Sequence, residues 1–199
     1  MNTRVLEKQI DRGSEEQRLT LFGVTWEQYE SLRDTLDDFP RLRMRYLEGT
    51  LEIYMPSSKH ERIKSLVGRL IELYCLEKNI RLYACGSTTY RKQAQQRGLE
   101  PDESYCIETD KALPDLAIEI VVTSGSIQLL DIYQGLGISE VWLWRDDRFG
   151  LYRLQGKQYE EISDSTVLPK LDIELLTRCV NIPDQNDAVL NFRKAITGQ

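Results

Sequence analysis

The run LPDLAIEIVV at residues 113–122 constrains the fold more than any other stretch of this sequence. It is short, apolar and rich in β-branched residues, and a Pro-Asp pair precedes its apolar core, which is the pattern of a strand buried on both faces. Glu119 lies deep inside this run. Burying an ionised carboxylate is costly unless a metal ion or a charged partner compensates it. Glu119 is therefore predicted to belong to a functional site.

The segments after this run predict a βαβ unit. Residues 123–137 have the start signal and apolar spacing of a helix, and residues 139–145 (SEVWLWR) have the pattern of a further strand. A strand, a crossover helix and a strand imply a parallel strand pair. Trp142 and Trp144 alternate with apolar residues, so we expect both in the core on one face of the sheet.

The remaining segments complete an α/β layout. We predict an edge strand at residues 18–22, a helix at about 25–36 with a capping-box start, and a hairpin at 41–55. A long helix at 59–77, strands at 80–85 and 87–92, a loop at 93–98, a hairpin at 149–162 and two short C-terminal helices follow. The expected fold class is α/β, with one central mixed sheet flanked by helices.

Length and charge narrow the class of protein. With 199 residues we expect a polar arm at 1–17 and a single domain at 18–199. The sequence has no signal-peptide core and no membrane-spanning run, so we expect a cytoplasmic protein. A net charge of −6 argues against a general nucleic-acid coat protein but allows a local basic groove. Four scattered cysteines and a single histidine disfavour a zinc site.

A second carboxylate is expected beside Glu119. Asp115 lies on the same strand, and side chains four residues apart on a strand are roughly 13 Å apart, too far to chelate one ion. Asp102, in the earlier Pro-Asp pair, precedes a different strand that could pair alongside. Two converging carboxylates bind Mg²⁺, which activates water and neutralises charge on a phosphoryl oxygen. Taken alone, Asp102 is more often a turn residue after proline, whereas a half-buried position at the rim is the less favoured alternative for Glu119.

The order of these elements resembles the PD-(D/E)xK nuclease superfamily with its restriction-endonuclease-like fold, and more specifically the bacterial Uma2 (DUF820) family within it. The resemblance covers roughly residues 20 to 160. The elements that carry it are Leu47-Glu48-Gly49, Pro56-Ser57, His60, Pro101-Asp102, Pro114-Asp115-Leu116, Glu119-Ile120, Thr123-Ser124-Gly125, Tyr133 and Gly137-Ile138-Ser139-Glu140-Val141-Trp142.

The resemblance implies particular roles. Asp102 and Glu119 would be ligands of Mg²⁺ or Mn²⁺, Glu48 a third acidic contributor, and His60 a residue of the cleft. A glutamate before a turn is more often a surface acid, and a lone histidine is as often structural.

The sequence departs from the superfamily at the basic residue. The superfamily places a lysine two residues after the glutamate, and members of this family can carry it four residues before the tyrosine; here these positions are Val121 and Leu129. Lys92 or Arg91, before Asp102, could replace it in space, and Gln128 is a weaker candidate. Loss of one hydrogen-bond donor that stabilises the transition state typically lowers the reaction rate by about 10²–10³-fold.

The resemblance thus implies a metal-dependent endonuclease acting on DNA, with catalytic residues Glu48, Lys92, Asp102 and Glu119, and with a possible homodimer suited to double-strand cutting. Cationic clusters such as Arg41, Arg43 and Arg45 could follow a phosphate backbone, although solvated faces are the usual fate of such charges. The missing lysine supports an alternative, a catalytically degenerate binding or assembly module. A small-molecule enzyme is a further alternative, but the sequence lacks a phosphate-binding glycine-rich loop.

Overall fold

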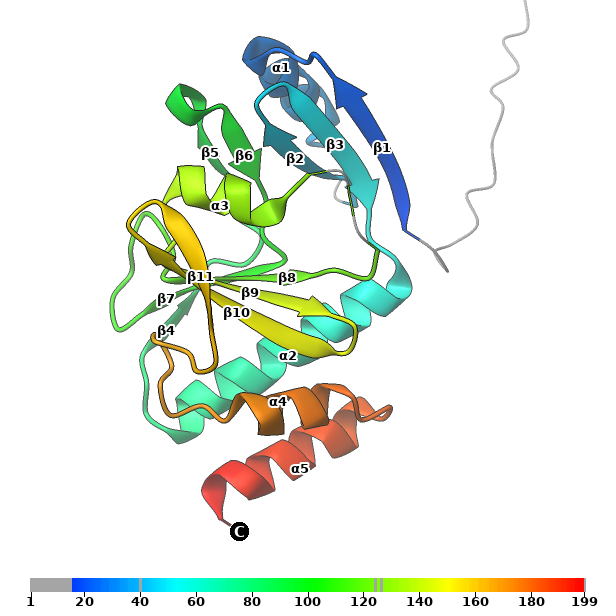
Figure 1. Ribbon diagram of the computed structural model, residues 1–199. Helices are drawn as coiled ribbons and strands as arrows, with labels where there is room; N and C mark the ends of the chain where they lie inside the picture. Colours follow the sequence, from blue (N-terminus) through cyan, green and yellow to red (C-terminus); the bar gives the residue numbers. More distant parts are fainter. Residues whose placement is uncertain (1–15, 40, 124, 126, 199) are drawn as a thin grey trace, which may run out of the picture.

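The strands form two sheets, both visible in Figure 1. The computed structural model describes residues 16–39, 41–123, 125 and 127–198. The first sheet is antiparallel, in the order β1 (Gln17–Phe22), β3 (Thr50–Met55), β2 (Arg43–Leu47), β6 (Arg97–Leu99) and β5 (Tyr90–Lys92). The second sheet is mixed, in the order β11 (Gln158–Ile162), β10 (Arg148–Gln155), β9 (Glu140–Arg145), β8 (Leu116–Ile120), β7 (Glu103–Ile107) and β4 (Leu82–Ala84).

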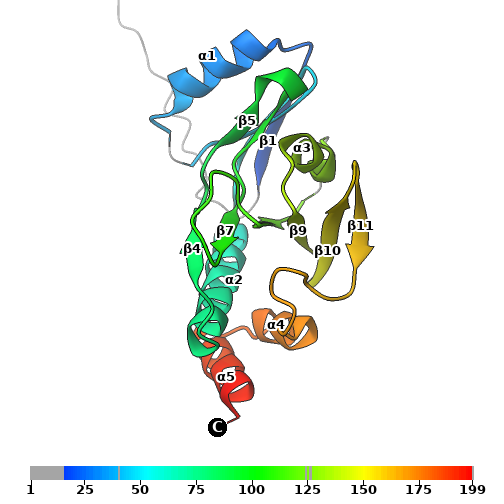
Figure 2. The ribbon, with the colours of Figure 1, turned by 90° about the vertical axis from the view of Figure 1, so that its left-hand side faces the viewer.

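The helices cover the two sheets in layers. α2 (Ser58–Glu77) and α4 (Ile173–Val180) pack on one face of the second sheet, and α5 (Gln185–Thr197) packs against both helices. α3 (Leu129–Leu136) lies on the opposite face, between the two sheets, while α1 (Trp26–Leu36) covers the first sheet. Figure 2 shows α1 and α5 at opposite ends of the molecule. Within the described residues, no helix is long and apolar enough to cross a membrane.

The predicted βαβ unit is confirmed. β8 pairs with β9 in parallel, with Glu119 opposite Leu143, and α3 connects the two strands. Side chains alternate across β8, so that Ile118 faces the α2 side while Ala117 faces α3. Trp142 also packs in the core on the α2 side, as predicted.

Side-chain caps explain where three helices begin. Thr25 and Gln28 form the predicted capping box of α1, Ser57 accepts from the backbone of His60 at the start of α2, and Asp172 caps α4. α3 is shorter than predicted, because it begins at Leu129 rather than near residue 123.

The α/β class with a central mixed sheet flanked by helices is confirmed, but the single sheet is wrong. The hairpin of β2 and β3 belongs to a separate antiparallel sheet. The loop predicted at 93–98 is also partly wrong, since it contains a short 3-10 helix (Gln93–Gln95) and the first residues of β6. β6 is three residues long and too polar to show strand alternation. Residues 1–15 of the predicted arm lie outside the described residues, and the single domain at 18–199 stays a prediction.

Candidate active site

Asp102 and Glu119 lie side by side at the centre of the second sheet. β7 runs antiparallel to β8 with Glu103 opposite Ile118, so Asp102, just before β7, comes beside the end of β8. The backbone N–H of Ile120 donates to Asp102 Oδ2 at 2.7 Å. The two acids are 3% and 0% exposed, respectively. Strand pairing thus creates the buried carboxylate pair, whose roles as metal ligands stay a prediction.

A buried arginine from the first sheet forms an ion pair with Glu119. Arg45 Nη2 donates to Glu119 Oε2 at 2.6 Å, and Arg45 Nη1 donates to Glu52 Oε1 at 3.3 Å. The guanidinium carbon also lies 4.3 Å from the ring centroid of Tyr54, and Arg18 forms a second ion pair with Glu52. Burial lowers the pKa of Arg45, but Tyr54 and the carboxylates of Glu119, Asp102 and Glu52 raise it further, so the pKa ends above its ordinary value.

Tyr133 completes the surroundings of Glu119. Its hydroxyl, carried on α3, donates to Glu119 Oε1 at 2.6 Å, so each carboxylate oxygen accepts one hydrogen bond. Burial raises the pKa of Glu119 to about 7; Arg45 opposes this shift and Asp102 adds to it. Because a carboxylate oxygen has two lone pairs, each oxygen keeps acceptor capacity beyond these bonds.

His60 holds the other carboxylate. It lies in the first turn of α2, fully buried, with Nε2 3.1 Å from Asp102 Oδ2 and Nδ1 3.6 Å from Glu61. Burial lowers the pKa of His60, but the hydrogen bond to Asp102 and the nearby carboxylate of Glu61 outweigh burial and raise the pKa to about 9. The contact between His60 Nε2 and Asp102 Oδ2 therefore fixes the orientation of Asp102.

Three predicted site residues lie elsewhere. Glu48 is in the β2–β3 turn at φ 46°, with its side chain 67% exposed and 2.9 Å from Arg97. Lys92 is exposed on β5, and Arg91 pairs with Glu30 at 3.0 Å. Within the described residues, none of the three contacts the carboxylate pair.

The site contains residues that sequence reasoning did not assign to it. Glu52, rather than Glu48, is the hairpin acid beside Arg45, and Arg45 appeared only as a member of a cationic strand face. The signal was present in the hairpin, because a turn at Glu48-Gly49 sets Arg45 opposite Glu52. Tyr133 was identified only as a motif residue.

A cavity of about 250 Å³ adjoins the site on the α3 side. Val121 and Leu129, the two positions where the resemblance expects lysine, both line it, and so does Arg45. Gln128 and Arg145 contribute polar groups to the same wall. Arg45, on another strand, thus lines the same cavity as both motif positions.

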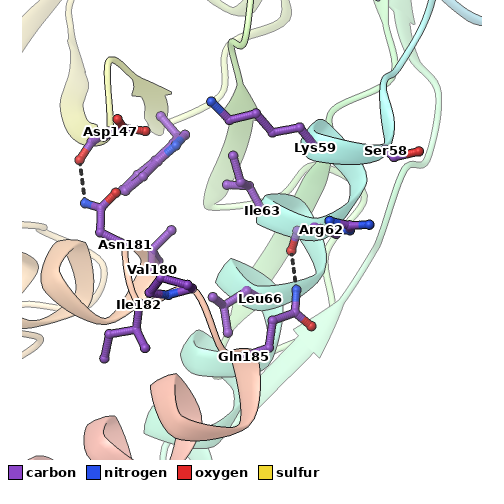
Figure 3. Close-up of a pocket in the computed structure, with 12 residues that line it drawn as sticks. Ser58, Lys59, Arg62, Ile63, Leu66, Asp147, Val180, Asn181, Ile182 and Gln185 are labelled. Atoms are coloured by element: carbon purple, nitrogen blue, oxygen red, sulfur yellow. Dashed lines mark hydrogen bonds between the residues drawn. The ribbon is translucent and has the colours of Figure 1, made fainter. Parts of the chain in front are cut away.

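A larger groove of about 660 Å³ lies between α2 and the α4–α5 connection (Figure 3). Trp144, one of its lining residues, packs in the core on the α2 side, opposite to the face that carries Glu119. Lys59 extends over the groove, and Asn181 donates to the Asp147 carbonyl at 2.8 Å. This groove is therefore separate from the carboxylate pair.

The donor chemistry of Asp102 and Glu119 fits Mg²⁺ or Mn²⁺, which prefer carboxylate oxygens. Within the described residues, no group of three histidine, cysteine, aspartate or glutamate side chains could hold a metal ion. Two carboxylates still fit Mg²⁺, because this ion usually keeps several waters and binds through one or two carboxylates together with substrate phosphates.

Comparison with known proteins identifies the family. The model of Uma2, described as "Putative restriction endonuclease", matches residues 26–180. A crystal structure titled as a putative nuclease belonging to DUF820, from Anabaena variabilis ATCC 29413, is 17% identical; it aligns over 75% of this chain and 90% of its own, with a TM-score of 0.39. No curated protein matches the chain. Because the family model spans well over half of the sequence, the chain belongs to the Uma2 family.

Proposed function

We propose that this protein is a metal-dependent endonuclease that hydrolyses phosphodiester bonds in DNA. The observation that carries the proposal is the buried Asp102–Glu119 pair with the Arg45 guanidinium against it. Membership of a family described as "Putative restriction endonuclease" supports the same chemistry. A cytoplasmic location and a homodimer that cuts both strands belong to this proposal.

Asp102 and Glu119 would hold Mg²⁺ or Mn²⁺, and Glu52 replaces Glu48 as the nearby third acid. When bound, the ion supplies Lewis acidity and a nucleophile at neutral pH. Other residues of the chain orient the two carboxylates and place a positive charge beside them. His60 and the Ile120 N–H fix Asp102, and Tyr133 fixes Glu119. Arg45 takes the electrostatic role that the sequence analysis gave to Lys92, because it contacts Glu119 directly.

The first test is calorimetric titration of Mn²⁺ into the wild-type protein and into Glu119→Gln. We expect saturable binding in the wild type and at least a tenfold loss in the variant, on the order of one lost charged ligand. Plasmid cleavage in Mn²⁺ should be lost in Glu119→Gln and in Asp102→Ala. Circular dichroism melting of each variant checks that the fold persists. Cleavage that survives both substitutions in folded protein would exclude this site.

A second candidate function is a catalytically degenerate binding or assembly module. The specific observation in its favour is that Arg45 and Tyr133 already occupy both oxygens of Glu119, while lysine is missing from positions 121 and 129. Absence of Mn²⁺ binding in the wild type, together with absence of cleavage, selects this candidate.

A further inference from the structure

We propose that Cys85 and Cys106 form a reversible disulfide when the protein meets a peroxide, and that this bond ties together the β4 edge of the second sheet. The inference goes beyond the proposed function and does not depend on it. It assigns an oxidation site to two cysteines that take no part in the candidate active site.

Strand pairing brings the two sulfur atoms together. β4, at the end of the strand order, pairs antiparallel with β7 and sets Tyr83 opposite Cys106. The N–H of Cys85 donates to the Ser104 carbonyl at 2.8 Å, so Cys85 continues this ladder two residues after Tyr83. Cys85 and Cys106 are therefore diagonal neighbours on one face of the sheet, and their Sγ atoms lie 3.6 Å apart. Side-chain rotation and a small shift of the sheet edge would bring them to the bonded distance of about 2.05 Å.

The surroundings of the two thiols give them different roles. Cys85 is partly exposed and directly follows the last residue of β4, where a small oxidant can reach it. Cys106 is buried, its Sγ donates to the Lys111 carbonyl at 3.5 Å, and burial raises the pKa of its thiol. An accessible thiol beside a second thiol that can resolve its oxidised form is typical of redox-sensing cysteines.

The reaction takes place in two balanced steps. The Cys85 sulfur attacks one oxygen of hydrogen peroxide and the O–O bond breaks, which gives a sulfenic acid on Cys85 and one water. The Cys106 sulfur then attacks the Cys85 sulfur, the S–O bond breaks and a second water leaves. Two thiols are oxidised, one peroxide is reduced, and both thiol protons end in the two waters. A dithiol reductant reverses the reaction by thiol–disulfide exchange.

The bond would stabilise the folded protein. It closes a loop of chain that contains β5, β6 and Asp102. Such a cross-link removes conformational freedom from the unfolded chain. β4 has only three residues and lies at the edge of its sheet, so the disulfide would also hold this short strand against β7.

Thiol counting on the full-length protein tests the reaction. The protein would be reduced with dithiothreitol, desalted, treated with hydrogen peroxide and then with catalase, and its free thiols counted in guanidinium chloride. Cys85→Ser removes the partly exposed member of the pair. Cys179→Ala is the matched control, because it removes a thiol of the core on the α2 side. Mass spectrometry of non-reduced peptides identifies the bonded cysteines, and circular dichroism melting checks that both variants fold.

We expect peroxide to lower the count in the wild type from four thiols to two, and dithiothreitol to restore four. Cys179→Ala should fall from three to one, whereas Cys85→Ser should keep three. The peptide map should show Cys85 bonded to Cys106 within a monomer. Four thiols left in the oxidised wild type, an equal loss in Cys85→Ser, or a different bonded pair overturns the proposal.

Urea unfolding tests the effect of the bond on the fold. We expect a higher midpoint for the oxidised wild type than for the reduced wild type, and equal midpoints for Cys85→Ser before and after peroxide. Equal midpoints for the two forms of the wild type would overturn the stabilising role of the bond. These measurements use neither a metal ion nor a nucleic acid, so their outcomes are distinct from those that test the endonuclease.

Discussion

Arg45 is the residue whose chemistry departs most from the lysine that the superfamily motif expects. It approaches Glu119 from the opposite sheet, whereas a motif lysine would come from β8 itself or from α3. Arginine stays charged at all relevant pH values and cannot take a proton from water, whereas a lysine can be tuned to do so. Arg45 therefore supplies fixed positive charge to Glu119 but cannot act as a base.

Substitution of Leu129 by lysine tests whether the site lacks only this group. Leu129 is 7% exposed and lines the cavity beside Arg45, so a lysine there can extend its ammonium group toward Glu119. We expect Leu129→Lys to raise Mn²⁺-dependent cleavage by up to about 10², the usual effect of one well-placed donor. Leu190→Lys, at an exposed position on α5, is the control. Equal rates in a folded Leu129→Lys and in the wild type would show that another group limits the reaction.

The sequence was informative about the carboxylates because their positions follow from strand order and from the cost of burying charge. It was less informative about their partners. Tyr133 and Arg45 reach Glu119 from α3 and from the first sheet, and such contacts depend on how layers pack rather than on local spacing. Glu52 was the exception, because hairpin register alone pairs it with Arg45.

At the scale of elements, local signals decided most helix and strand boundaries. Capping residues set the starts of α1, α2 and α4, and alternation identified the long strands. The elements that were predicted wrongly from the sequence are short or polar. β6 is three residues long, and the segment before α3 has helical spacing without helical structure where it is described. Strand pairing and helix packing, rather than intrinsic propensity, determine such segments.

The capping box of α1 gives a quantitative test at this scale. The Thr25 hydroxyl accepts from the Gln28 N–H at 3.3 Å, and Gln28 Oε1 accepts from the Thr25 N–H at 2.8 Å. We expect Thr25→Ala to lower the free energy of unfolding by about 1 kcal/mol, because helix N–H groups lose their acceptor. Ser31→Ala, at an exposed position inside the same helix, should cost nothing or stabilise slightly. Urea unfolding measures both; equal midpoints for the two variants would contradict the role of the cap.

At the scale of the whole molecule, α3 joins the two sheets. Its buried residues Ile132 and Leu136 share one apolar cluster with Leu99 of the first sheet and Val141 of the second. The α/β class and the βαβ unit were predictable from periodicity. The division into two sheets was not, since it depends on β2 pairing with β6 across a long stretch of chain.

Removal of packing at α3 should destabilise both sheets together. Ile132 is fully buried, so Ile132→Ala is expected to cost about 2–5 kcal/mol through lost transfer energy and a residual cavity. Urea unfolding followed by tryptophan fluorescence and by far-ultraviolet circular dichroism should show one shifted, coincident transition. Leu190→Ala, at the exposed position on α5, serves as the control with a small effect. Two separate transitions in Ile132→Ala would indicate that the sheets unfold independently.

The ion pair between Arg45 and Glu119 also has a mechanical consequence. Arg45 belongs to the first sheet and Glu119 to the second, so their ion pair connects the two sheets at the candidate site. A divalent ion that displaced Arg45 from Glu119 would weaken this connection between the sheets. By thermodynamic reciprocity, a change that stabilised the Arg45–Glu119 contact would then weaken ion binding, and ion binding would weaken this contact between the sheets.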